Sequence, residues 1–156
     1  MQLYLVRHGK AEEGTGDDHE RRLTADGIKK LETEARVIKE LGIRPTRIYS
    51  SPRVRARQTA EIIARALGMD ITIDEAVNFG FDLSAVARLI SGLPEDAQVM
   101  FVGHNPSMSN VVQALTGASV DLKVGGLARV DILFPGPALS GQLAWLLAPR
   151  VFEALD

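Results

Sequence analysis

The feature that most constrains the fold is a short apolar segment, Gln2–Val6, that stops at the tripeptide Arg7-His8-Gly9. The segment contains β-branched and aromatic residues, which predicts a buried β-strand. Arg7 and His8 then follow the carboxyl end of that strand, and Gly9 allows the backbone to turn tightly and approach a ligand. In open parallel sheets, ligands bind in the crevice outside the carboxyl ends of the strands. The tripeptide therefore predicts a ligand site in an α/β protein.

Composition limits the classes of protein to consider. Of the 156 residues, 46% are apolar and 24% are charged, which is typical of a soluble globular protein, and we expect a single domain over residues 1–156. The net charge of −2 gives no overall attraction to nucleic acid or to an anionic membrane. The absence of cysteine excludes disulfides, thiolate catalysis and cysteine-based metal sites. With neither a signal-like leader nor a run of about 18 apolar residues, we expect a cytoplasmic protein.

The apolar periodicity predicts strands that alternate with helices. Thr24 is a predicted N-cap, and the helix that it opens is expected to stop at Gly42. Leu31 and Leu41 are expected on the buried face of that helix. Pro52 is a predicted first-turn residue of a second helix, which ends at residue 68. Further helices are expected over 83–91 and 107–116, and further strands over 47–51, 71–73 and 99–103.

The last third of the chain contains two strand-like segments, 129–134 and 142–147, which prolines and glycines separate. This arrangement predicts a hairpin at or near the edge of a sheet. Together with the alternating elements before it, the hairpin predicts an α/β fold: a three-layer sandwich whose central sheet is mostly parallel and carries an antiparallel edge.

Chemically active side chains follow the ends of three predicted strands. His8 follows the first strand, Arg55 lies in the first turn of the helix after 47–51, and His104 follows 99–103. If these strands are parallel neighbours, the two histidines, Arg7 and Arg55 converge on one crevice beside helix N-termini. Guanidinium groups bind phosphoryl oxygens and offset negative charge in a transition state. The pattern therefore predicts an anion site, most naturally for phosphate.

His8 also has the chemistry of a nucleophile. A neutral imidazole nitrogen is nucleophilic at neutral pH, and neighbouring arginines disfavour the imidazolium form. A phosphohistidine intermediate, with water as the second nucleophile, divides a hydrolysis into two easier steps. Taken singly, Arg7 has a simpler explanation as a partner of Glu12 or Glu13, and each histidine has one as a structural residue. Their combination favours the phosphate site.

Other polar residues are expected to have plainer roles. Arg53 and Arg57 are predicted to lie on a solvated helix face, and His19 is predicted to lie at the surface. No histidine spacing typical of a zinc site is present, and arginines repel a cation, so no metal is expected. A mobile loop is predicted for Lys10–Arg22. Its turn-forming residues are Gly14, Thr15, Gly16, Asp17 and Asp18.

Three motifs occur in the order found in a known family. They are Arg7-His8-Gly9, the segment from Ser51-Pro52 through Arg55-Ala56 to Gln58-Thr59-Ala60, and Gly103-His104-Asn105-Pro106. With these motifs, residues 1–116 resemble the histidine phosphatase superfamily, whose fold is phosphoglycerate-mutase-like. The short chain and the segment from Arg22-Leu23-Thr24 to Gly27 are similar to its small SixA-like branch, the phosphohistidine phosphatases.

The resemblance implies a role for each of four residues. His8 would be the nucleophile that becomes phosphorylated, and Arg7 and Arg55 would hold the phosphoryl oxygens. His104 would donate to a phosphoryl oxygen in the transition state. The resemblance also implies a reaction that needs no metal and no other cofactor.

The proton donor is the part of the family pattern that this chain lacks. Larger members carry an acidic donor in a segment inserted after the second helix, and this chain has little room for such a lid. Glu75 and Asp82 are the nearby candidates. Their alternative is a surface or helix-cap role, particularly for Asp82, which directly precedes a predicted helix.

The missing donor bears on the substrate. A phosphomonoester leaves as an alkoxide and needs a general acid, whereas phosphohistidine expels an imidazole, for which water suffices. A site without a lid also admits a protein surface. We therefore expect a metal-independent phosphatase that acts on phosphohistidine of a protein partner. The alternatives are a phosphatase of a small phosphorylated metabolite and a module that binds phosphate without catalysis, and phosphoglycerate mutase activity is less favoured because it needs the lid.

Overall fold

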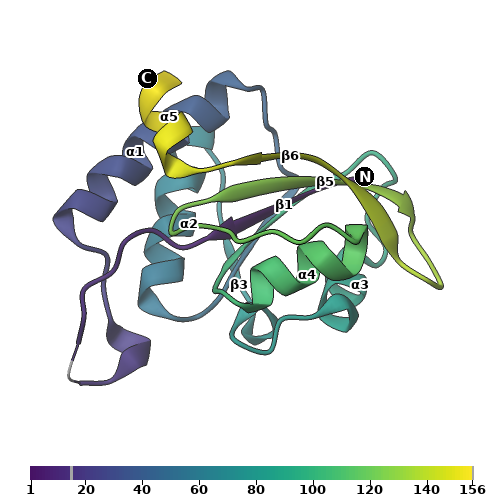
Figure 1. Ribbon diagram of the computed structural model, residues 1–156, viewed down its shortest axis with the longest axis horizontal. Helices are drawn as coiled ribbons and strands as arrows, with labels where there is room; N and C mark the ends of the chain where they lie inside the picture. The colour runs from purple at the N-terminus through teal and green to yellow at the C-terminus, as the bar shows by residue number, and fades with distance from the viewer. Residues whose placement is uncertain (15, 156) are drawn as a thin grey trace.

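The computed structural model describes residues 1–14 and 16–155. They form a six-stranded sheet with helices on both faces (Figure 1). The strands are β1 (Gln2–Arg7), β2 (Arg47–Ser50), β3 (Thr72–Ile73), β4 (Gln98–Gly103), β5 (Leu127–Phe134) and β6 (Ser140–Leu147). The helices are α1 (Ala25–Glu40), α2 (Val54–Leu67), α3 (Leu83–Ile90), α4 (Ser107–Thr116) and α5 (Pro149–Leu155), with short 3-10 helices η1 (Asp18–Glu20) and η2 (Glu75–Val77).

The sheet has a parallel part and an antiparallel part. Its strand order is β3-β2-β4-β1-β5-β6. The strands β3, β2, β4 and β1 are parallel neighbours, whereas β5 runs antiparallel to β1 and β6 antiparallel to β5. The predicted α/β fold, with its mostly parallel sheet and its hairpin at one edge, is confirmed.

Side-chain alternation along the strands produces the three layers. In β1, Leu3 and Leu5 are buried in one core with residues of α3 and α4, whereas Tyr4 and Val6 are buried in a second core with residues of α1, α2 and α5. Successive side chains of a strand point to opposite faces, so one apolar strand serves both cores. In the described part of the chain, no helix is long and apolar enough to cross a membrane.

Two local predictions are wrong, and one helix was missed. Pro52 is not in the first turn of a helix, because Arg53 is still extended (φ −65°, ψ 138°) and α2 begins at Val54. Leu41 is 50% exposed, because it is the C-cap that follows the last turn of α1. The buried face of α1 instead includes Glu34, which is 3% exposed. The terminal helix α5 was not predicted, since its seven residues are too few for a clear helical period.

Candidate active site

The candidate site lies where β1 and β4 end side by side. Arg7 is opposite Gly103 in the parallel pair, and the backbone N–H of His8 donates to the carbonyl of Gly103 at 3.0 Å. The chain leaves β1 toward α1 on one face and leaves β4 toward α4 on the other. Such a divergence opens a crevice at the strand ends. The imidazole rings of His8 and His104 lie in it, with their centroids 5.3 Å apart.

Residues of the second motif hold the loop that carries His8. The backbone N–H of Gly9 donates to Thr59 Oγ1 at 3.0 Å, and that of Leu23 donates to Gln58 Oε1 at 2.8 Å. Buried polar groups of a loop need such partners. The first turns of α2 therefore position the loop on which His8 stands.

His8 is held in one tautomer. Its Nδ1 lies 2.7 Å from the carbonyl oxygen of Gly9, and because a carbonyl only accepts, Nδ1 carries the proton. The lone pair of Nε2 faces Arg55, whose Nε donates to it at 3.3 Å. Burial lowers the pKa of His8 to about 4, opposed by the Gly9 hydrogen bond and assisted by the charges of Arg55, Arg7 and Arg21. At neutral pH, Nε2 is therefore an unprotonated nucleophile.

His104 is buried deeper than His8 and is also neutral. Its exposure is 1%, and the ring of Phe79 contacts it edge-on at 4.8 Å between centroids. Its Nε2 lies 2.8 Å from Ser51 Oγ, whereas its buried Nδ1 has no partner in residues 1–14 and 16–155. Burial, followed by the charges of His8 and Arg55, lowers the pKa of His104 to about 3. One ring nitrogen is thus free to form a hydrogen bond.

Three guanidinium groups meet at the carboxylate of Asp18. The sequence predicted only a loop at this residue. Asp18 Oδ2 accepts from Arg53 Nη1 at 2.6 Å and from Arg55 Nη2 at 3.2 Å. Asp18 Oδ1 accepts from Arg21 Nη1 at 3.0 Å. The Arg21 hydrogen bond, with the charges of Arg55 and Arg53, lowers the pKa of Asp18. Asp18 therefore accepts from guanidinium donors of the kind that also bind phosphoryl oxygens.

The prediction that Arg53 lies on a solvated face is wrong. Its side chain is only 17% exposed; it donates to Asn78 Oδ1 at 2.8 Å and lies 3.9 Å from the ring centroid of Phe79. The prediction assumed a helical position, whereas Arg53 is the extended N-cap of α2. Arg57 does lie within the helix and, as predicted, is a surface residue, 45% exposed beside Glu61.

Arg7 and Arg55 have different hydrogen-bond partners. Arg55 is 4% exposed, and its Nη1 donates to the backbone carbonyl of Asp18 at 2.8 Å. Arg7 Nη1 donates to the carbonyl of Leu122 at 3.0 Å, and its buried Nε has no partner among the described residues. Burial lowers the pKa of both arginines. The structure thus brings together the four residues that the sequence selected.

The two candidate proton donors have other contacts. Asp82 accepts the backbone N–H of Ala85 at 2.9 Å and is the N-cap of α3, which is the alternative role considered for it. Glu75 accepts from Asn78 Nδ2 at 2.8 Å, so it supports the residue that Arg53 contacts. Over residues 1–14 and 16–155, no group of three or more His, Asp or Glu side chains is arranged to hold a metal ion.

The predicted mobile loop, 10–22, includes Thr15, which lies outside the described residues. The segments on either side are paired, because the N–H of Glu12 donates to the carbonyl of Arg22 at 2.8 Å. His19 is a surface residue beside Glu20, as predicted. The one sequence feature that could have pointed to Asp18 is its position three residues before Arg21, shortly before the N-cap Thr24 of α1.

A mostly parallel α/β sheet with paired neutral histidines among arginines at its crevice defines an enzyme for an anionic substrate. The family model of the histidine phosphatase superfamily (branch 1) matches residues 3–78. An uncharacterized protein of Picosynechococcus sp. is 33% identical over 138 residues, which cover 81% of this chain and 82% of that protein. The chain belongs to the histidine phosphatase superfamily and is a histidine-type phosphatase.

Solved structures agree in fold along nearly the whole chain. The putative phosphohistidine phosphatase SixA from Agrobacterium tumefaciens is 30% identical with a TM-score of 0.79, over 95% of this chain and 97% of that one. The protein histidine phosphatase SixA complexed with tungstate has a TM-score of 0.85 at 24% identity, over 97% of this chain and 99% of that one.

A further relative matches only part of the chain in sequence. A probable phosphoglycerate mutase, GpmB of Escherichia fergusonii, is 46% identical over 78 residues, which are 47% of this chain but only 35% of that protein.

Proposed function

We propose that the protein removes the phosphoryl group from phosphohistidine on a protein partner through a covalent phosphohistidine at His8. The observation that carries this proposal is the state of His8, whose Nδ1 proton is held by the Gly9 carbonyl and whose pKa of about 4 leaves the ring neutral. A neutral imidazole whose Nε2 carries no proton is able to attack phosphorus.

The reaction takes two displacements. In the first, His8 Nε2 attacks phosphorus, the P–N bond to the substrate imidazole breaks, and the leaving imidazole keeps the electron pair and takes a proton from water. In the second, water attacks phosphorus and loses a proton to solvent, and the bond to His8 breaks. Inorganic phosphate and neutral His8 result, so no metal and no other cofactor enters either step.

The surrounding groups are suited to stabilise the phosphoryl oxygens. Arg55 and Arg7 supply positive charge near His8, and Arg55 exchanges its contacts with Asp18 for contacts with substrate. When the Ser51 hydroxyl donates to His104 Nε2, the free Nδ1 carries the proton and donates to a phosphoryl oxygen.

The leaving group decides between substrates. Asp18 is the carboxylate nearest the arginines, and the hydrogen bond from Arg21 lowers its pKa, so it is a poor proton donor at neutral pH. An imidazole leaving group needs no strong acid, whereas an alkoxide does. The likeness to the putative phosphohistidine phosphatase of Agrobacterium tumefaciens supports the same choice. We also propose a cytoplasmic location, where phosphohistidine partners are accessible.

A small phosphorylated metabolite is the second candidate substrate. The 46% identity over 78 residues with a probable phosphoglycerate mutase favours it. A module that binds phosphate without catalysis is a third possibility, but it has no use for a neutral histidine nucleophile.

Phosphate release, measured with EDTA present, separates these functions. The two substrates are a phosphohistidine-bearing protein domain and p-nitrophenyl phosphate, and the variants are His8→Ala and, as a matched surface control, Glu32→Gln. We expect release from the protein substrate that depends on His8 and is unchanged in Glu32→Gln. Faster release from the ester assigns the enzyme to small molecules, and no release from either substrate contradicts the proposal in favour of the binding module.

A further inference from the structure

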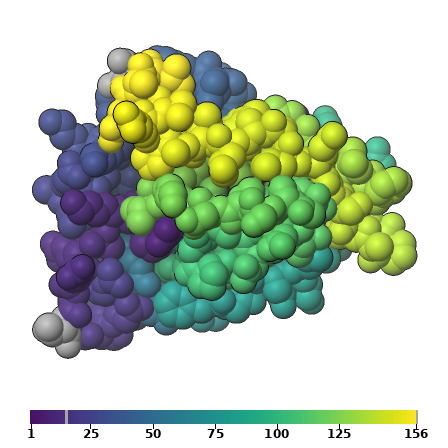
Figure 2. Space-filling view, viewed as in Figure 1, coloured from purple at the N-terminus to yellow at the C-terminus, as the bar shows by residue number. Residues whose placement is uncertain are grey.

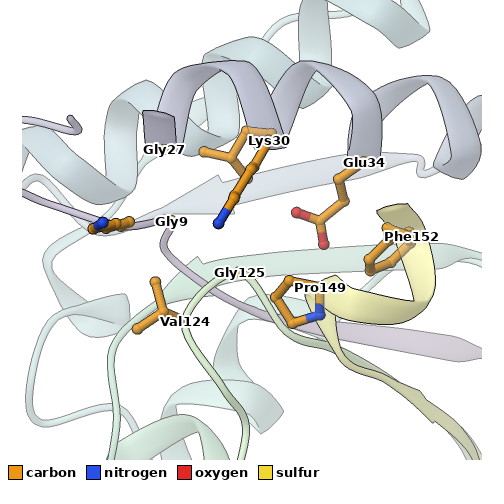
Figure 3. A pocket seen from close by; sticks show the side chains of 10 residues that line it. Gly9, Gly27, Lys30, Glu34, Val124, Gly125, Pro149 and Phe152 are labelled. Atoms are coloured by element: carbon orange, nitrogen blue, oxygen red, sulfur yellow. The ribbon is translucent and has the colours of Figure 1, made fainter. Parts of the chain in front are cut away.

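A separate pocket lies beside Gly9, the residue that follows His8 (Figure 3). Its volume is about 260 Å³, and four segments line it: the loop after β1, helix α1, the turn before β5, and helix α5. In Figure 2, the yellow C-terminal helix, the green turn and the purple N-terminal segment meet on one face of the molecule. Glu34 is the buried carboxyl group that lines this pocket. It has no part in the proposed phosphatase reaction.

Glu34 is the polar group of this pocket. It is 3% exposed, and its carboxyl group points into the pocket between α1 and the Gly125 turn (Figure 3). Its Oε2 lies 3.6 Å from the place that a Cβ on Gly125 would take. Its buried Oε1 has no hydrogen-bond partner in the described part of the chain. A buried polar atom without a partner is uncommon in a folded protein and costs stability.

The cations nearest to Glu34 are engaged elsewhere. Lys30, one turn before it on α1, pairs with Asp26 at 3.3 Å and with Glu153 at 3.7 Å. Lys10 lies 3.9 Å from the same Asp26 carboxylate. Two lysines and two acids therefore balance at the rim. Among the described residues that line the pocket, Glu34 is the ionisable side chain without an ion pair.

The walls of the pocket are apolar. Leu31 contributes from α1, Val124 from the turn before β5, and Phe152 from α5. A ligand that fits must therefore place an alkyl chain against these walls and a hydrogen-bond donor on Glu34. A cationic donor suits the site best, because a buried carboxylate is stable only when it is paired, and an anion would be repelled.

We propose that this pocket binds a primary alkylammonium group, with the ammonium on the Glu34 carboxylate and the alkyl chain against Leu31, Val124 and Phe152. A free amine and a lysine side chain of a partner protein present this same chemistry. The site is independent of the phosphatase reaction, so either assignment stands if the other is wrong.

Amide NMR of the intact protein, titrated with n-butylammonium chloride, tests the site. Gly9, Gly27 and Gly125 line the pocket, so their amide signals are the reporters. We expect saturable shifts of these signals, and binding weakened at least about tenfold in Glu34→Gln, which keeps the shape and removes the charge. Glu32→Gln, an exposed change on the same helix, should bind as the unchanged protein does.

The wild-type protein provides a second measurement that requires no variant. n-Butanol has the same alkyl chain without the charge and should bind at least about tenfold more weakly. Equal shifts with n-butanol, or shifts that persist in Glu34→Gln, would overturn the proposal. Nα-acetyl-lysine-N-methylamide distinguishes the sources: binding as tight as that of n-butylammonium indicates a lysine of a partner protein, and much weaker binding indicates a free amine.

Discussion

Asp18 and Glu34 are two carboxyl groups with separate sets of neighbours, and their surroundings are opposite. Asp18 has a half-exposed side chain that hydrogen-bonds with three guanidinium groups, which lower its pKa. Glu34 is buried beside apolar side chains, and burial raises its pKa well above the ordinary value. The chain has a net charge of −2, yet three guanidinium groups gather at Asp18, whereas the two lysines at the rim of the Glu34 pocket are balanced by two acids. Excess positive charge is therefore a local property of the Asp18 side.

Replacement of His8 should have the largest effect, because the arginines near Asp18 are proposed to support a reaction at His8 Nε2. Rapid-quench labelling with a ³²P-phosphohistidine protein should give acid-labile label on the wild-type enzyme and none on His8→Ala, with turnover abolished. His19→Ala, which changes a surface histidine, should keep both label and turnover. Equal labelling of all three proteins would remove His8 from the mechanism.

Arg55→Ala removes a buried guanidinium from the same side. Loss of one preorganised donor to a phosphoryl oxygen should cost about 2 to 4 kcal/mol of transition-state stabilisation, or about 30- to 10³-fold in kcat/KM. Arg57→Ala, on the exposed face of α2, is the matched control and should change the rate no more than about twofold. Similar losses in both variants would point to a general effect of charge instead of a placed donor.

Glu34→Gln probes the other side through stability. Because burial raises the folded-state pKa of Glu34, the protonated form stabilises the fold below the unfolded pKa of about 4.3, and this stability is lost as pH rises through the folded pKa. The groups facing the pocket, Lys10, Lys30 and Glu153, stay paired at its rim. At pH 8, the variant should be about 1 to 3 kcal/mol more stable than wild type.

Urea unfolding at pH 4.5 and pH 8 measures this difference. The gap between Glu34→Gln and wild type should widen at the higher pH, whereas Glu32→Gln should stay within about 0.5 kcal/mol of wild type at both. A gap that does not depend on pH would show that Glu34 has the same ionisation in the folded and unfolded chains.

Asp18→Asn should have the smallest effect. Removing the charge frees the guanidinium groups from a competitor, so inorganic phosphate should inhibit about two- to fivefold more tightly, as expected for a partly exposed ion pair. Glu20→Gln, an exposed neighbour in η1, should leave the inhibition constant unchanged. Weaker inhibition in Asp18→Asn would mean that Asp18 positions the arginines for phosphate instead of competing with it.

Much of the fold followed from local patterns. The apolar run 2–6 and the N-cap of Thr24 predicted β1 and the start of α1 because strand alternation and capping depend on neighbouring residues. The prediction for Arg53 failed because this residue is extended and precedes α2, so its side chain does not point in the direction expected from a helical position. The single domain and the cytoplasmic location stay predictions, as do the roles of the four site residues.

By itself, the sequence determined which side chains come after the strands. Each of Arg7, His8, Arg55 and His104 belongs to a motif that follows a strand predicted from local patterns. Tertiary structure alone decided what those side chains meet. The parallel pairing of β1 with β4 set the two histidines 5.3 Å apart, and the return of the loop brought Asp18 to the arginines. The burial of Glu34 depended on the Gly125 turn and on α5, which lie about 90 and about 115 residues further along the chain, respectively. Contacts so distant in sequence leave no signal in the apolar periodicity of α1.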